Sequence, residues 1–227
     1  MGKEIFTPEE RQALATPYPV RIEDCLRKNR VEQALVLCGE LKESQVLLHD
    51  FFADSCTVLW SWVGQHLGEE TIEDMFRYVF EQSMRRQLFD IGGTVVGFPP
   101  HLGAFFLAKV CWRAHSCFQA GEHPGDFSIT EDSEKFSFHM QPCGSGGRLW
   151  RRGLYEPGRG GKVSETARTW TYNRQDFPYY CIHCSFLNEI LPYEAIGALM
   201  WPVDPLEGPD DVCTWHLYKD PNRIPDR

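Results

Sequence analysis

The spacing of apolar residues changes about halfway along the chain, and this change limits the fold more than any other feature. From about residue 8 to residue 120 apolar side chains recur every three or four residues, as in "TIEDMFRYVF", which is typical of amphipathic helices. Later, "DFSITEDSEKFSFHMQPC" alternates apolar and polar residues on both sides of a polar turn, which predicts a β-hairpin. Together these patterns predict an α+β fold, in which a helical N-terminal layer packs on a small antiparallel sheet.

The helical half has clear local signals. Thr7 is placed as an N-cap, Pro8 occupies the first helical position, and Glu10 stands where a capping box requires it. The segment "PPHLGAFFLAKVCWRAHSCFQAG" predicts a last helix that ends at Gly121. We therefore expect a single domain over 1–227, with a mainly helical layer up to residue 121.

The second half, residues 122–227, holds the predicted sheet and a long irregular segment. The chain from Gly144 to about Arg168 is rich in glycine and arginine and has little periodicity, so it predicts a long loop. The segment "YYCIHCSFLNEILPYEAIG" predicts a helix with a break near Pro192, and "DDVCTWHLYKD" predicts a final strand.

The composition limits the kinds of molecule that this chain is expected to bind. A chain with 42% apolar and 24% charged residues is expected to fold, and a net charge of −9 argues against nucleic acid or an anionic membrane as the main partner. The N-terminus lacks the apolar run of a signal peptide, and no stretch approaches the ~20 apolar residues that span a bilayer. We expect a soluble, cytoplasmic protein that binds a small-molecule substrate or ligand, and the apolar helices are compatible with a homodimer.

In a reducing cytoplasm nine cysteines are not expected to form disulfides, and an odd number cannot pair completely within one chain. Cys143 follows a predicted strand, Cys181 and Cys184 form a C-x2-C pair at the start of a predicted helix, and Cys213 lies in the last strand. Such a pair can present both sulfurs to one ion, with further ligands from elsewhere. These cysteines are therefore predicted to bind a metal, with zinc favoured and iron or an iron–sulfur cluster as alternatives. Buried inert thiols, a redox pair and a thiolate nucleophile stay open.

The run "CGSGGRLWRRG" directly follows the predicted hairpin. Gly146 and Gly147 allow close approach of the backbone to a ligand, and Arg148 brings a fixed positive charge that suits a carboxylate or phosphate. We predict substrate binding by these three residues. The alternative is a surface loop with solvated arginines, and the spacing matches neither a Walker loop nor a dinucleotide fingerprint.

Two further residues are candidates for catalysis. His139 lies four residues before Cys143 and is a candidate ligand, general base or core histidine. Glu189 is one of the carboxylates nearest to the C-x2-C pair and is a candidate for orienting a water molecule.

The layout of the second half resembles the family of L-2-amino-thiazoline-4-carboxylic acid hydrolase-like proteins. The resemblance lies in a strand that ends in Cys143, the helix around Cys181 and Cys184, and "DDVCTWHLYK" as a strand with Cys213. It implies an α+β fold and hydrolytic opening of a small heterocyclic acid. In that case the four cysteines and His139 would activate water and assist at the ring C=N bond, while Arg148 would bind the carboxylate.

These observations lead to a first hypothesis and two alternatives. The first is a metal-dependent hydrolase that acts on carbon–nitrogen bonds of a small heterocyclic or aromatic acid. The second is a non-catalytic small-molecule-binding or sensor domain with a structural metal. The third is an iron–sulfur redox protein.

Overall fold

The computed structural model describes residues 5–84, 127–196 and 201–225, so the helix predicted over 99–121 lies outside the described residues. The chain divides into two compact units, Met1–Leu48 and His49–Arg227. This division lies inside one long helix, whereas the change of composition lies near residue 121. The fold is α+β, as the sequence predicts.

The first unit consists of α1 (Pro8–Ala15), α2 (Tyr18–Arg27) and the first turns of α3 (Val31–Leu67). The predicted capping box at the start of α1 is confirmed. Thr7 Oγ1 accepts a hydrogen bond from the Glu10 backbone N–H at 3.1 Å, and Glu10 Oε2 accepts one from the Thr7 N–H at 2.7 Å. The buried core of this unit is small and consists of Cys25, Ala34 and Leu37.

The second unit begins within α3, and the helix buries its small side chains there rather than its large ones. Ala53, Thr57 and Ser61 stand every fourth residue and are essentially fully buried, whereas Phe51 and Phe52 are 71% and 64% exposed. Small side chains let other segments of the protein approach the helix closely. For example, the Ser61 hydroxyl accepts a hydrogen bond from the Lys162 backbone N–H at 2.9 Å. Apolar spacing therefore predicted the helix, but it did not predict the buried face.

Helix α4 (Glu70–Val79) continues into a π-helical turn, η1 (Phe80–Met84). The apolar stripe predicted from "TIEDMFRYVF" is confirmed at Ile72, Phe76 and Phe80, which are all buried, but not at Val79, which is exposed. They pack in one core cluster with side chains of the cysteine-bearing segment. Buried members of that cluster from the second half of the chain include Trp170, Phe177, Tyr179, Ile182, Phe186 and Leu191.

Within the described residues the sheet contains four strands in the order β1-β2-β4-β3, and all neighbours are antiparallel. The strands are β1 (Phe127–Glu131), β2 (Lys135–Met140), β3 (Val203–Asp204) and β4 (Cys213–Tyr218). The predicted hairpin and final strand are therefore confirmed. Phe138 pairs with Trp215 and Met140 with Cys213, so these four side chains share one buried face of the sheet.

The segment between β2 and β3 is more ordered than the sequence predicts. The expectation of a loop from residue 144 is wrong at its start, because Gly146–Arg151 forms helix α7. Irregular chain with the 3-10 turn η2 (Thr169–Thr171) follows. The predicted cysteine-bearing helix is built from η3 (Tyr179–Cys181), α8 (Ile182–Ser185), the π-helical η4 (Phe186–Ile190) and α9 (Leu191–Ile196).

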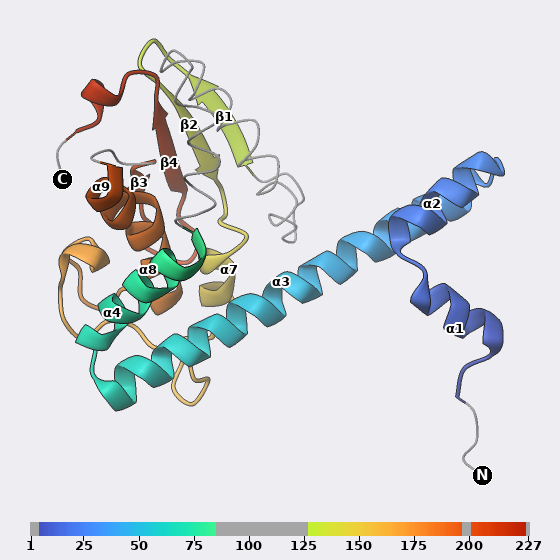
Figure 1. The fold of residues 1–227 in the computed structure, drawn as a ribbon, viewed down its shortest axis with the longest axis horizontal. Helices are drawn as coiled ribbons and strands as arrows, with labels where there is room; N and C mark the ends of the chain where they lie inside the picture. The colour runs from blue at the N-terminus through green and yellow to red at the C-terminus, as the bar shows by residue number, and fades with distance from the viewer. Residues whose placement is uncertain (1–4, 85–126, 197–200, 226–227) are drawn as a thin grey trace. The chain divides into compact units, whose positions relative to one another are not determined.

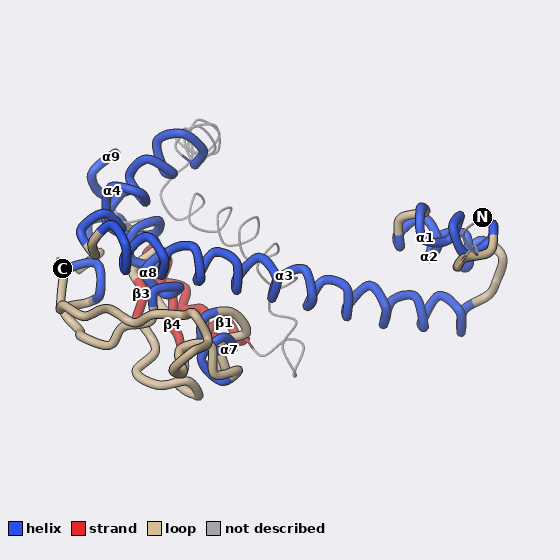
Figure 2. The backbone as a smooth tube through the Cα atoms, turned by 90° about the horizontal axis from the view of Figure 1, so that it is seen from below, coloured by secondary structure: helices blue, strands red, loops and turns tan. Residues whose placement is uncertain are grey.

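Figures 1 and 2 show α8 beside strands β3 and β4, with α4 and α9 close to it. The chain then leaves β4 for a short 3-10 turn, η5 (Pro221–Arg223). None of the described helices combines the length and apolarity needed to cross a bilayer.

The buried sheet face gives a direct test of the packing. Phe138 has no exposed surface, so we expect Phe138→Ala to lower the free energy of unfolding by about 3–5 kcal/mol. Its cross-strand partner Ile129 is 53% exposed, and Ile129→Ala should change the free energy by only about 0.5 kcal/mol. Urea denaturation of both variants measures the difference. Equal losses would contradict the assignment of Phe138 to the core.

Candidate functional site

The four cysteines predicted to act together come from separate elements of the second unit. Cys143 follows β2, Cys181 ends η3, Cys184 lies in α8, and Cys213 begins β4. Cys143 and Cys213 are buried in the same apolar cluster beneath the sheet, and Cys184 packs against that cluster. All four are free thiols. We call these residues the four-cysteine set.

The members of the four-cysteine set lie close enough to influence one another's ionisation. Burial raises the pKa of the Cys184 thiol, and the other three cysteines of the set raise it further. Burial also raises the pKa of Cys213, with an additional increase from Cys143, and the same two causes raise the pKa of Cys181. Cysteines up to seventy residues apart in the sequence thus lie close together in the fold, and the thiols of Cys181, Cys184 and Cys213 stay protonated at neutral pH.

The side chains of the four-cysteine set do not surround a common point at which an ion could bind. Among the residues that the structure describes, no group of three or more His, Cys, Asp or Glu side chains is arranged to hold a metal ion. The chemical type and the shared location of the four thiols suit a thiophilic metal, whereas their present orientations do not form a ligand shell.

The two glycines predicted to approach a substrate instead approach the cysteines. A Cβ atom added at Gly146 would lie 2.6 Å from Cys181 Sγ, and one added at Gly147 would lie 3.1 Å from Cys143 Cβ. Both glycines are buried in α7. Their lack of a side chain lets this helix pack directly on two members of the four-cysteine set.

The arginines of α7 already have partners in the protein. Arg148 Nε and Nη2 donate to the two carboxylate oxygens of Asp50, each at 3.0 Å. Arg152 forms a similar two-bond pair with Asp54, with both distances at 3.1 Å. The guanidinium predicted to bind a substrate carboxylate is therefore held by a carboxylate of α3.

The two predicted catalytic residues occupy different places. His139 lies between Thr130 and Thr214 on the sheet face opposite Phe138, and its ring nitrogens are 3.0 Å and 3.2 Å from their hydroxyl oxygens. Glu189 is buried, accepts a hydrogen bond from the Val203 backbone N–H at 2.5 Å, and contributes to raising the pKa of Cys184. The structure thus brings Glu189 to the four-cysteine set and places His139 away from it.

His183, the histidine between the two cysteines of the C-x2-C pair, is closer to the thiols than His139 is. Its Nε2 atom lies 3.5 Å from Cys184 Sγ, and its Nδ1 atom contacts the Tyr180 carbonyl oxygen. The imidazole also packs edge-on against the Tyr180 ring, with 4.7 Å between ring centroids.

A second group of polar residues was missed by the sequence analysis. Ser145 Oγ is 3.0 Å from His49 Nε2 and 2.9 Å from the Tyr180 hydroxyl oxygen, and His49 Nδ1 is 3.4 Å from Asp50 Oδ1. The signals available were the polar pair "HD" inside the apolar run "VLLHDFFA" and the serine between glycines in "CGSGG". Neither signal indicates that the two segments meet, because His49 and Ser145 are 96 residues apart.

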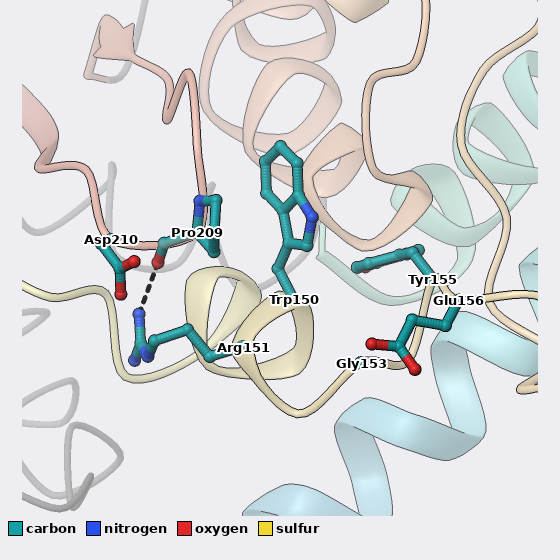
Figure 3. Close-up of a pocket in the computed structure, with 7 residues that line it drawn as sticks. All are labelled: Trp150, Arg151, Gly153, Tyr155, Glu156, Pro209 and Asp210. Atoms are coloured by element: carbon teal, nitrogen blue, oxygen red, sulfur yellow. Dashed lines mark hydrogen bonds between the residues drawn. The ribbon is translucent and has the colours of Figure 1, made fainter.

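A cavity of about 440 Å³ lies at the C-terminal end of α7 (Figure 3). Trp150 and Tyr155 contribute aromatic rings to its wall, and Glu156 and Asp210 contribute carboxylates. Arg151 points toward Pro209 and donates to its carbonyl oxygen at 2.6 Å. A second Arg151 bond, at 2.9 Å, reaches the Cys143 carbonyl oxygen and links the cavity wall to the four-cysteine set.

No known protein family, no curated protein and no solved structure matches this chain. The resemblance to thiazoline carboxylic acid hydrolase-like proteins therefore stays a prediction.

Thiol reactivity tests the description of the four-cysteine set. Only the thiolate reacts with iodoacetamide, so we expect Cys181, Cys184 and Cys213 of metal-free native protein to remain unmodified at pH 7 and to react faster as the pH rises. The exposed Cys38 should react first and serves as the internal control. Peptide mass spectrometry measures both. Rapid alkylation of Cys181 at pH 7 would contradict a protonated thiol at this position.

The Asp50–Arg148 pair predicts a pH-dependent contribution to stability. Burial would raise the pKa of Asp50, but the hydrogen bond from Arg148 and the charges of Arg148 and Arg152 outweigh it, so the pKa is lowered. A lowered folded-state pKa stabilises the protein above the unfolded-state pKa, and this contribution is lost as the pH falls through the folded-state pKa. Asp50→Asn should therefore destabilise the protein at pH 7 and have much less effect in acid.

Urea denaturation of wild type and variant across this pH range measures the effect. Asp54→Asn is the matched control, because Asp54 also pairs with an arginine but is more exposed, and we expect a smaller loss there. A loss for Asp50→Asn that stays constant down to strongly acidic pH would contradict a stabilising ionised carboxylate.

Proposed function

We propose that the second unit is a metal-binding domain in which the four-cysteine set holds a thiophilic ion, with zinc as the favoured ion. The observation that carries this proposal is the gathering of four thiols that lie far apart in the sequence. Cys143 and Cys213 are buried in one cluster, Cys184 packs against it, and helix α7 packs on both Cys143 and Cys181. Four soft sulfur donors in a buried location suit zinc or an iron–sulfur cluster better than they suit magnesium or calcium.

The protonation of the thiols is compatible with such a site. A bound cation favours the thiolate, so binding would reverse the effect of burial and release protons. The sulfurs would turn toward the ion by rotation about the Cα–Cβ bonds, between staggered rotamers. Cys213 belongs to β4 and Cys184 to α8, so shared ligation would join the sheet to the helix that packs on it.

A structural role for the metal is better supported than metal-dependent hydrolysis. The hydrolase hypothesis assigned Arg148 to a substrate carboxylate and His139 to the metal or to water. Arg148 is paired with Asp50, and His139 lies on the opposite face of the sheet. We therefore propose a small-molecule-binding or sensor domain stabilised by a metal, in which the cavity beside Trp150 and Tyr155 receives the small molecule.

Metal content tests this proposal. Protein purified anaerobically without a metal-affinity tag should contain close to one zinc ion per chain, or iron with visible absorption if a cluster is present. Cys181→Ser and Cys184→Ser should each lower the metal content several-fold and lower the thermal midpoint of unfolding. Elemental mass spectrometry and a thermal melt measure these two effects.

The matched control is Cys38→Ser, which removes an exposed thiol of the first unit and should leave metal content unchanged. Wild-type protein that contains no metal after expression and also binds none when titrated with zinc would overturn the proposal.

A further inference from the structure

Four side chains next to the four-cysteine set form a hydrogen-bonded chain with the atoms needed for nucleophilic catalysis. Ser145 Oγ lies 3.0 Å from His49 Nε2, and His49 Nδ1 lies 3.4 Å from Asp50 Oδ1. His49, Asp50 and Ser145 all belong to the second unit. A hydroxyl, an imidazole and a carboxylate in this order are the groups of a serine nucleophile with its general base.

Asp50 fixes the imidazole in the useful tautomer. Two hydrogen bonds from Arg148 hold the carboxylate, and its lowered pKa keeps it ionised at neutral pH. An ionised carboxylate accepts a proton-bearing nitrogen, so Nδ1 of His49 carries the hydrogen. The lone pair of Nε2 then faces Ser145 Oγ. The imidazole is only slightly exposed, with a side-chain accessibility of 10%.

Tyr180 supplies a hydroxyl on the other side of the serine. Its oxygen lies 2.9 Å from Ser145 Oγ, and the side chain is buried. Hydroxyl hydrogens rotate to suit the available partner. When the serine proton points to His49, the phenol hydrogen is available as a donor beside the nucleophile.

We propose that Ser145 and His49 are the nucleophile and general base of an acyl-transfer site, with Tyr180 as the donor to the developing oxyanion and Asp50 as the positioning residue. The expected substrates are carboxylic esters.

The reaction balances without a further reactant except water. Ser145 Oγ forms a bond to the acyl carbon as its proton moves to His49 Nε2, and Tyr180 donates a hydrogen bond to the oxyanion. The bond from the acyl carbon to the leaving alcohol breaks, and the alcohol takes the proton from His49. Water then attacks the acyl group on Ser145, again through His49, and releases the carboxylic acid and free Ser145.

A second serine of the unit has similar partners and provides a comparison. Ser137 Oγ lies 2.9 Å from His216 Nδ1, and His216 Nε2 lies 2.7 Å from Asp204 Oδ2. Ser137 is buried in the middle of β2, and Asp204 is 67% exposed, so its charge is screened by solvent. Ser145 is half-buried and has the additional Tyr180 hydroxyl. Ser137 is therefore the matched control.

Covalent labelling tests the proposal directly. An alkyl fluorophosphonate reacts when an activated serine oxygen attacks phosphorus and fluoride leaves. Full-length wild-type protein should gain one adduct, which peptide mass spectrometry should locate on Ser145. Ser145→Ala should abolish this adduct, and Ser137→Ala should keep it. His49→Gln retains a polar side chain of similar reach but cannot act as a base, and it should lower the labelling rate at least about 100-fold.

Turnover of p-nitrophenyl acetate provides the second readout. Ser145→Ala should reduce turnover to the background rate, whereas Asp50→Asn should lower kcat with little change in KM, as expected for a residue that acts through His49. Both assays are repeated after treatment with a chelator. Labelling that survives metal removal would show that the acyl-transfer site does not depend on the proposed metal.

The absence of a Ser145 adduct on wild-type protein with a cooperative thermal melt would overturn the proposal. It would also be overturned by equal labelling rates in wild type and folded His49→Gln. Neither result depends on whether the alanine variants fold.

Discussion

The ion pair between Asp50 and Arg148 is the contact on which the arrangement of the site depends. It joins α3 to α7 through two hydrogen bonds of 3.0 Å in a mostly buried setting. The same turn of α3 carries His49, and the residue before α7 is Ser145, so the pair also brings these two side chains together. With α7 held there, Gly146 and Gly147 face Cys181 and Cys143. This single ion pair thus holds Ser145 beside His49 and α7 beside the four-cysteine set.

Local sequence patterns predicted much of the fold, because those elements depend on near neighbours in the chain. The capping box at Thr7 and the β-hairpin are both encoded within a few residues. Helix α7 was missed because two glycines at its start disfavour a helix by about 1 kcal/mol each relative to alanine. Close packing on the thiols requires those glycines, and that requirement is visible only in three dimensions.

The sequence predicted only part of the candidate site, because contacts between distant residues are not visible in local patterns. Spacing within the sequence identified the four cysteines but did not show whether Cys213 faces the other three. The pairing of β2 with β4, which places Met140 opposite Cys213, brings Cys213 into the same buried cluster as Cys143. The partner of Arg148 is 98 residues away, so a guanidinium available for substrate was a reasonable expectation that local sequence could not correct. The face of His139 depends on strict alternation in β2, which the pairing with β4 establishes.

Tyr180 is close to both the proposed metal site and the proposed acyl-transfer site. Its hydroxyl contacts Ser145, and members of the four-cysteine set contribute to raising its pKa after burial. X-ray absorption at the zinc edge of the zinc-loaded protein tests whether the cysteines hold the ion. Ligation by the four-cysteine set predicts a shell of sulfur atoms at about 2.3 Å from the zinc. A shell made only of nitrogen or oxygen at about 2.0–2.1 Å would contradict it.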